Sequence, residues 1–178
     1  GDLAATISGH AQGVFISFEG GEGSGKSTQS KLLKEYLESQ GHTVTLTREP
    51  GGTKLGKDLR EILLHTHDEV SPRAEALLYA ADRAHHVETL IRPALERGEI
   101  VITDRYMDSS IAYQGAGRVL SPGEVGRISR WATESLIPTL TIIIDLPSEI
   151  GLGRLKSRDR LERESLDFHE RVRQEFLS

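Results

Sequence analysis

The sequence predicts an α/β fold in which a central parallel sheet is covered by helices on both faces, giving three layers. Short apolar runs at residues 14–19, 100–104 and 140–145 are separated by long helical patterns. Strands of this kind, apolar on both faces and joined through helices, are typical of parallel sheets buried on both sides. In addition, a glycine-rich segment follows the first run and leads directly into a helical pattern.

Length and composition limit the classes of protein that need be considered. A chain of 178 residues favours one domain with a substantial core. The net charge of -5 gives no general basic surface for nucleic acid, and the lack of cysteine removes disulfides and thiolate metal sites. No apolar run approaches the roughly 18 residues of a membrane span. We therefore expect a cytoplasmic protein without a nucleic-acid or membrane partner.

Residues 1–13 are small and polar and have no clear periodicity. We expect an N-terminal tail or linker there, followed by one domain at residues 14–178.

The glycine-rich segment GGEGSGKS, residues 20–27, is a phosphate-binding loop of the P-loop NTPase fold. It lies between an apolar β-prone run and a helical pattern, which is the context that the motif requires. Glycines let successive backbone N–H groups converge on phosphate oxygens, and we expect Lys26 to reach the β and γ phosphates and the Ser27 hydroxyl to bind Mg²⁺. A plain glycine-rich turn would explain the glycines but neither Lys26 nor Ser27. The residues expected to bind ATP are Gly20, Gly21, Glu22, Gly23, Ser24, Gly25, Lys26, Ser27 and Thr28.

The sequence pattern also predicts the elements that lie between the phosphate loop and the strand at residues 100–104. A long helical region opens at Ser71 and Pro72, an N-cap and N1 pair, and restarts before Glu96. Before it, the pattern predicts a helix over 29–40 stopped by Gly41, a strand over 42–47, an irregular loop over 48–53 and a helix over 55–64.

Four polar features follow predicted strands: the phosphate loop, the REPGGT loop at 48–53, Asp104 and Asp145. Ligands of open α/β sheets bind at the carboxyl ends of the strands. The four features are therefore expected at one edge of the sheet.

Asp104 and Arg105 follow a strand directly. A carboxylate there suits the outer shell of Mg²⁺, and an arginine can hold the charge of a transferring phosphoryl group. A simple salt bridge at the strand end is the structural alternative. The hydroxyl and amide groups at 109–115 are expected to form a polar pocket wall.

The segments FEGGEGSGKST, TREPGGT, LLYAADR and DRYMDSSIAYQG, in this order and spacing, resemble the thymidylate kinase family from about residue 14 to the end of the chain. The resemblance implies transfer of the γ phosphoryl group of ATP to dTMP, giving dTDP for dTTP synthesis, with Mg²⁺ and commonly a homodimer. It also implies a last strand and helix beyond Ser178, since the family continues into them.

The resemblance implies roles for individual residues of the acceptor site. Glu22 meets the 3′ hydroxyl, Tyr79 stacks on thymine and Arg83, one turn later, hydrogen-bonds the base. Ordinary helix packing with a solvated arginine is the alternative for this pair. Arg105 holds the acceptor phosphate. The other residues expected to contact dTMP are Arg48, Pro50, Arg60, Ser109, Ser110, Tyr113 and Gln114.

The family has a lid at about residues 153–163, the lid segment, which is a few residues shorter here than is usual. Because the phosphate loop has no arginine of its own, Arg154, Arg158 and Arg160 are expected to cover the phosphates during transfer. A solvated charged face is the alternative.

Three other functions remain open from the sequence: a small P-loop kinase for another nucleoside monophosphate, a nucleotide-dependent switch, and a non-catalytic nucleotide-binding fragment. The chain has no asparagine and so lacks the NKxD loop with which switch GTPases read guanine. The kinase reaction is expected to be direct in-line transfer without a covalent intermediate, because an acceptor phosphate is already nucleophilic.

Overall fold

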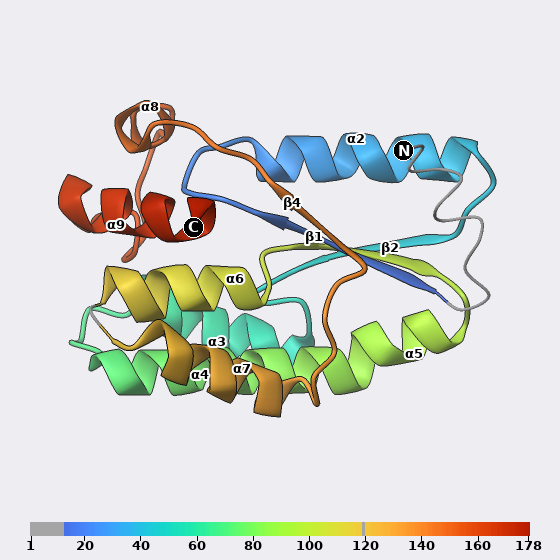
Figure 1. Cartoon of the computed structure of the whole chain (residues 1–178), viewed down its shortest axis with the longest axis horizontal. Coiled ribbons are helices and arrows are strands. Elements are labelled where there is room, and N and C mark those ends of the chain that lie inside the picture. The colour runs from blue at the N-terminus through green and yellow to red at the C-terminus, as the bar shows by residue number, and fades with distance from the viewer. Residues whose placement is uncertain (1–12, 119) are drawn as a thin grey trace.

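The computed structural model describes residues 13–118 and 120–178, so the predicted tail at 1–13 lies almost wholly outside the described residues. Four strands form one parallel sheet of order β2-β3-β1-β4 (Figure 1). They are β1 (Val14–Glu19), β2 (Val44–Arg48), β3 (Ile100–Asp104) and β4 (Leu140–Ile143).

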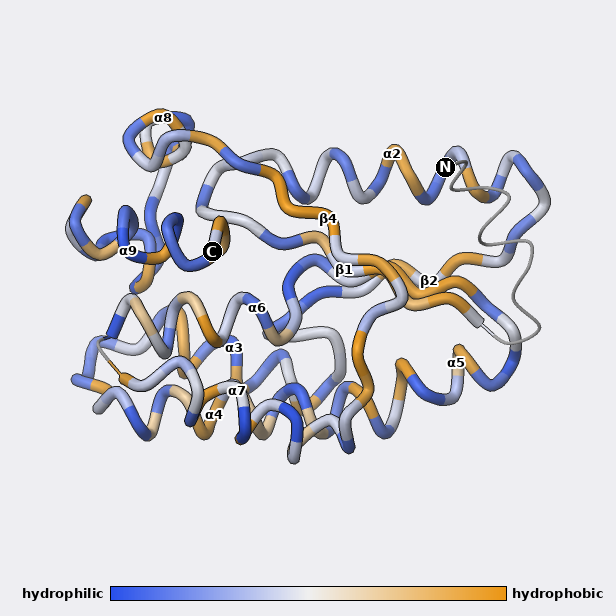
Figure 2. Tube along the Cα trace, viewed as in Figure 1, coloured by the Kyte–Doolittle hydropathy of each residue, from blue (hydrophilic) through white to orange (hydrophobic). Residues whose placement is uncertain are grey.

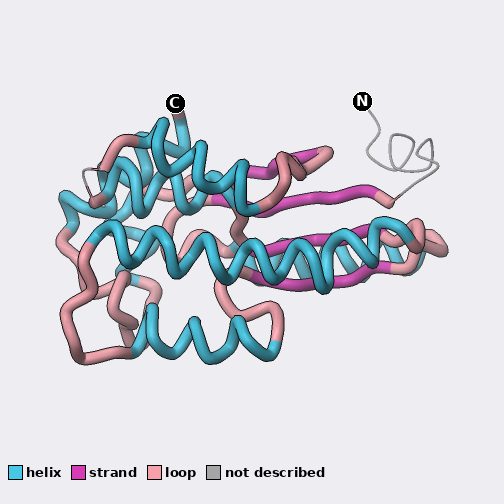
Figure 3. The backbone as a smooth tube through the Cα atoms, turned by 90° about the horizontal axis from the view of Figure 1, so that it is seen from below, coloured by secondary structure: helices cyan, strands magenta, loops and turns pink. Residues whose placement is uncertain are grey.

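Helices cover both faces of the sheet, which confirms the predicted three-layer arrangement. In Figure 1, α2 (Lys26–Ser39) lies above the sheet, and α3 (Lys54–His65), α4 (Pro72–His86), α5 (Arg92–Glu96) and α7 (Pro122–Ala132) lie below it. From below, a long helical segment crosses in front of the strands (Figure 3). The other helical elements are η1 (Val87–Ile91), α6 (Met107–Ser110), η2 (Ile111–Gly117), α8 (Ser148–Gly153) and α9 (Leu166–Leu177).

The central strands consist largely of hydrophobic residues, as the sequence predicts (Figure 2). Ile16 and Phe18 pack with Leu37 of α2 on one side, whereas Phe15 packs with Val101 and Ile91 on the other. Side chains alternate across a strand, so both helical layers use the sheet as their hydrophobic partner.

β4 departs from that expectation. Leu140 is 36% exposed and Ile143 is 42% exposed, and among the described strands β4 pairs only with β1. The prediction that every strand is buried on both faces is therefore wrong for β4, which is an edge strand here.

Local signals fix several helix boundaries. The Ser71 side chain accepts a hydrogen bond from the Ala74 N–H, and Pro72 occupies the first turn, as predicted. The restart before Glu96 is α5, which is joined to α4 through the π-helical turn η1 without an intervening loop. Pro93 has no N–H to give to the regular helical ladder, which accounts for the wider turn before it.

The carboxyl ends of all four strands lie at one edge of the sheet, because the strands are parallel and in register. This confirms that the phosphate loop, the REPGGT loop, Asp104 and Asp145 share an edge. Asp145, however, pairs with Arg173 at 2.9 and 3.0 Å near the surface. The other three features surround a cavity.

Candidate functional site

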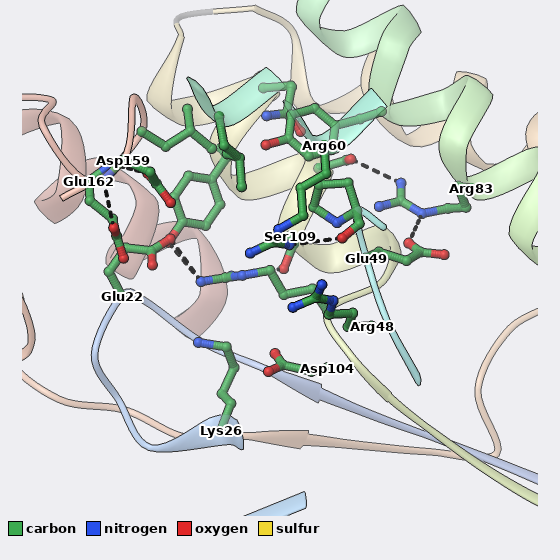
Figure 4. A pocket seen from close by; sticks show the side chains of 18 of the residues that line it. Glu22, Lys26, Arg48, Glu49, Arg60, Arg83, Asp104, Ser109, Asp159 and Glu162 are labelled. Atoms are coloured by element: carbon green, nitrogen blue, oxygen red, sulfur yellow. Dashed lines mark hydrogen bonds and ion pairs between the residues drawn. The ribbon is translucent and has the colours of Figure 1, made fainter. Parts of the chain in front are cut away.

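A cavity of about 310 Å³ opens at this edge. Figure 4 shows Glu22, Asp159 and Glu162 on one side, Arg83 and Glu49 on the other, and Lys26 and Asp104 at the base. Predicted residues that line it are Glu22, Lys26, Ser27, Arg48, Pro50, Arg60, Tyr79, Arg83, Asp104, Arg105, Ser109, Ser110, Tyr113 and Gln114. It is also lined by Glu49, Leu64, Asp159, Leu161 and Glu162, for which the sequence suggested no role.

The phosphate loop takes the backbone conformation for which its glycines were expected. Gly23 and Gly25 have positive φ angles of 67° and 94°, and α2 begins at Lys26. The Lys26 ammonium donates to the Gly21 carbonyl at 2.9 Å and to the Ser24 hydroxyl at 3.3 Å. Burial, followed by repulsion from Arg105, lowers the pKa of Lys26 to about 8. The ammonium is therefore held inside the loop, at the base of the cavity.

A second element holds the phosphate loop from outside. A Cβ atom added to Gly23 would collide with the Gly151 carbonyl of α8, and one added to Gly151 would collide with the Glu22 carbonyl. The two backbones approach so closely that only glycine fits at either position. The requirement at Gly151 was not recognised from the sequence.

Arg105 directly follows β3 and contacts residues on both sides of the cavity. Its guanidinium donates to the Gly20 carbonyl at 2.8 Å, to the Ser109 hydroxyl at 3.0 Å and to the Glu22 carboxylate at 3.0 Å. The Tyr113 hydroxyl donates to Glu22 at 2.8 Å. Burial opposes ionisation of Glu22, but Arg105 and Lys26 outweigh it and hold the Glu22 pKa at about 2. The Glu22 carboxylate therefore faces a cation, which removes the apparent conflict of an acid inside a phosphate loop.

Glu19, the last residue of β1, supports the segment that carries Ser109. Its buried carboxylate accepts the Ser109 hydroxyl and the backbone N–H groups of Tyr106 and Ser109, the latter two at 3.2 and 3.3 Å. Burial raises the pKa of Glu19 to about 7. An acid at the end of a largely apolar strand was a signal for this role that the sequence reasoning did not use.

Arg83 forms the far wall of the cavity and is 1% exposed, which rules out the alternative of a solvated arginine. Its Nε donates to Glu49 at 2.6 Å, and its terminal nitrogens donate to the Ser110 hydroxyl at 2.9 Å and the Tyr106 carbonyl at 3.0 Å. Glu49 also bonds His86 at 2.8 Å. Most donors of Arg83 are thus already engaged by protein groups that fix its plane.

Tyr79, one turn before Arg83 on α4, contributes an aromatic face. It is 7% exposed and belongs to an apolar cluster with Leu64 and Leu161, and all three line the cavity. Burial raises the pKa of its hydroxyl far above the ordinary value, so the side chain stays neutral. A flat apolar ligand such as a nucleobase fits this environment.

The three arginines of the lid segment have different partners in the structure. The Arg160 guanidinium bonds the Glu75 carboxylate and the Leu63 carbonyl, and Arg158 donates to the Leu152 carbonyl at 3.4 Å. Arg154 is exposed, and none of the three lines the cavity. The physical reason for Arg160 is Glu75, because a fully buried carboxylate requires cationic partners.

The lid segment instead turns Asp159, Leu161 and Glu162 toward the cavity. Burial raises the pKa of Glu162 to about 7, so this carboxyl holds its proton more readily than an ordinary glutamate. Glu75 and Glu162 both escaped sequence reasoning. For Glu75 the helical spacing was informative, since it lies one turn before Tyr79 and two turns before Arg83 on the same face.

Ser27 and Asp104 both line the cavity next to Lys26. A hydroxyl and one carboxylate are hard oxygen donors that suit Mg²⁺, which commonly takes one or two carboxylates and completes its shell with phosphate and water. Among residues 13–118 and 120–178, no cluster of three or more His, Asp or Glu side chains could hold a metal alone. The donor set therefore fits a magnesium ion that arrives with a nucleotide.

The parallel sheet, the glycine-rich loop leading into α2 and the cationic cavity beside it define a nucleotide-binding protein of the P-loop class. The model of the thymidylate kinase family matches residues 18–178. The chain belongs to the thymidylate kinase family, whose members phosphorylate dTMP to dTDP with ATP.

Individual relatives agree with this assignment. A thymidylate kinase of Clavibacter sepedonicus is 62% identical over 169 residues, covering 93% of this chain and 80% of the relative. One of Bifidobacterium longum is 55% identical over 170 residues, with 93% and 82% covered. The crystal structure of thymidylate kinase from Ehrlichia chaffeensis has a TM-score of 0.79 at 36% identity, covering 93% of this chain and 85% of that one. No helix within the described ranges is long and apolar enough to span a membrane.

Proposed function

We propose that this chain transfers the γ phosphoryl group of ATP to the 5′ phosphate of dTMP in one in-line step. The observation that carries the proposal is the position of Arg105, which contacts the phosphate loop through Gly20 and Glu22 and the opposite pocket wall through Ser109. A cation at that junction can hold the acceptor phosphate close to the donor.

The donor side is assigned to the phosphate loop, residues 20–28. Its N–H groups and Lys26 hold the phosphates of ATP, and Lys26 already lies buried at the base of the cavity. Ser27 and Asp104 would hold Mg²⁺, which neutralises charge on the transferring phosphoryl group. Arg154 and Arg158 are assigned to covering the donor phosphates, since both are exposed on the lid segment.

The acceptor side is assigned to the opposite half of the cavity. Tyr79 supplies the ring that stacks on thymine, and Arg83 and Gln114 supply donors toward its edge. Glu22 and Tyr113, which are hydrogen-bonded to each other, are assigned to the sugar. The remaining contacts are assigned to Arg48, Pro50, Arg60, Ser109 and Ser110.

We also infer that the chain forms a homodimer through α4 and α7. Trp131 of α7 is 81% exposed and Leu77 of α4 is 58% exposed, and both line one apolar groove. Large apolar side chains gathered on one surface mark association sites. We propose in addition that the protein acts in the cytoplasm, where ATP is available, and that it contributes to the supply of dTTP.

The proposed function is tested by measuring ADP release with dTMP, dUMP, CMP and AMP as acceptors. The expected result is the highest kcat/KM with dTMP and formation of dTDP in equal amount to ADP. A preference for CMP or AMP, or ADP release that does not depend on any acceptor, would refute the assignment.

A further inference from the structure

Glu75 of α4 is a fully buried carboxylate to which three side chains from two other parts of the chain donate. The Gln114 amide of η2 approaches at 3.4 Å, and Arg118, just after η2, donates at 3.1 and 3.2 Å. The third donor is Arg160 of the lid segment, which forms an ion pair with Glu75. A buried charge is tolerated when it is paired and hydrogen-bonded in this way.

Arg160 is also attached to the end of α3. Its backbone N–H donates to the Leu64 carbonyl at 2.9 Å, and its side chain donates to the Leu63 carbonyl. Its guanidinium is thus engaged through Nε and Nη2, and Arg160 is absent from the cavity wall. The lid segment is therefore anchored to α3 and α4, the elements that form the acceptor half of the site.

The next two residues of the chain, Leu161 and Glu162, line the cavity. Leu161 is 5% exposed and packs in one cluster with Leu64 and Tyr79. Tyr79 lies one helical turn after Glu75, so the carboxylate that holds Arg160 and the ring assigned to thymine share one face of α4. The position of Arg160 consequently sets the position of the part of the cavity wall that Leu161 and Glu162 form.

We propose that Glu75 and Arg160 form a brace that positions the lid segment over the acceptor nucleotide, and that Arg160 is a positioning residue for the monophosphate instead of a ligand of the ATP phosphates. The inference rests on the proposed function in naming dTMP as the acceptor. Without the brace, Leu161 and Glu162 lose their anchor, and the pocket around the base and sugar opens.

The test compares Arg160→Ala and Arg160→Lys with Lys156→Ala, a matched loss of one positive charge on the same exposed segment. Lysine keeps the charge but cannot bond the Glu75 carboxylate and the Leu63 carbonyl through one planar group. Three quantities are measured: the KM values for dTMP and for ATP, the Kd of dTMP alone by calorimetry, and hydrogen exchange at residues 153–163. Arg118 remains to pair Glu75 in these three variants, which favours retention of the fold.

The brace predicts that Arg160→Ala raises both the KM and the Kd for dTMP by about tenfold, through misplacement of the pocket wall. The KM for ATP stays within about twofold, since no donor contact is removed. Arg160→Lys is intermediate, Lys156→Ala matches the wild type, and exchange in the lid segment is faster only in the Arg160 variants. Glu75→Gln raises the KM for dTMP less in the Arg160→Ala variant than in the wild type, because in that variant the contact between the two residues is already lost.

A higher KM for ATP or a lower kcat, with dTMP binding unchanged, would overturn the proposal. Arg160 would then be assigned as a ligand of the ATP phosphates. If the wild type transfers no phosphoryl group to dTMP, the proposed function fails. The hydrogen-exchange measurement then tests the brace independently of activity. Equal exchange in Arg160→Ala and Lys156→Ala would overturn it in that case.

Discussion

At the residue scale, the site depends on charges that are balanced within the protein. Glu22, Arg105 and Lys26 lie together, and the pKa of Glu22 stays at about 2 because two cations outweigh the effect of burial. The same arrangement keeps Arg105 in place between the phosphate loop and Ser109. A preorganised cation stabilises developing charge without reorganisation during the reaction.

Replacing Lys26 by alanine is expected to lower kcat for dTMP phosphorylation by at least about 100-fold, as loss of one preorganised donor does. The fold should persist, because the ammonium bonds only groups of its own loop. A coupled ADP assay and circular dichroism measure the two effects. Lys34→Ala, a change at a partly exposed position of the same helix, is the control, and full turnover by Lys26→Ala would contradict the assignment.

Glu19 gives a pH prediction. Its pKa is raised from 4.5 to about 7 in the folded chain, so its contribution to stability is fully present below pH 4.5 and is lost as the pH rises through about 7. The unfolding free energy of the wild type minus that of Glu19→Gln should therefore fall by about 3 kcal/mol over this interval. Urea titrations at several pH values measure it. A difference that is constant or rises with pH would show that Glu19 is ionised in the folded protein.

At the element scale, the phosphate loop is shaped from both sides. α2 begins inside the motif, and α8 presses Gly151 against Glu22 and Gly23. The motif alone predicted the strand, the loop and the helix, because its spacing encodes local geometry. It could not predict α8, since contact between segments more than 100 residues apart has no local signal.

Gly151→Ala should raise the KM for ATP by about tenfold and lower the unfolding temperature, because the added methyl displaces the Glu22 carbonyl and the loop with it. Alanine normally favours a helix over glycine, so a loss of stability would report the close approach itself. The matched control is Gly153→Ala in the same helix, where an added Cβ meets no atom within 4 Å. Identical behaviour of the two variants would refute this contact.

Sequence patterns predicted the elements better than the partners of long side chains. Strands at 14–19 and 100–104 and the Ser71 cap are confirmed, and the predicted acceptor-site residues line one cavity. The partner of Arg160 could not be predicted, because the direction of its guanidinium depends on Glu75, a carboxylate 85 residues away. Buried acids such as Glu19, Glu49 and Glu75 escaped notice for the same reason, since their partners come from other elements.

At the scale of the whole molecule, the exposed apolar groove between α4 and α7 predicts association. Trp131→Arg should shift the protein from dimer to monomer in light scattering, because it places a charge in an apolar contact. Tyr36→Arg changes an aromatic side chain that is 50% exposed on α2 and should leave the dimer intact. A wild-type protein that is already monomeric, or a dimer unaffected by Trp131→Arg, would contradict this interface.

The account as a whole requires that two anionic nucleotides meet end to end in one cavity, between Lys26 and Arg105. The most direct measurement is inhibition by a bisubstrate compound in which adenosine and thymidine are joined through a chain of five phosphates. We predict that it competes with both ATP and dTMP and binds more tightly than either, because one molecule then fills both halves of the site. Competition with only one of the two nucleotides would contradict the central claim.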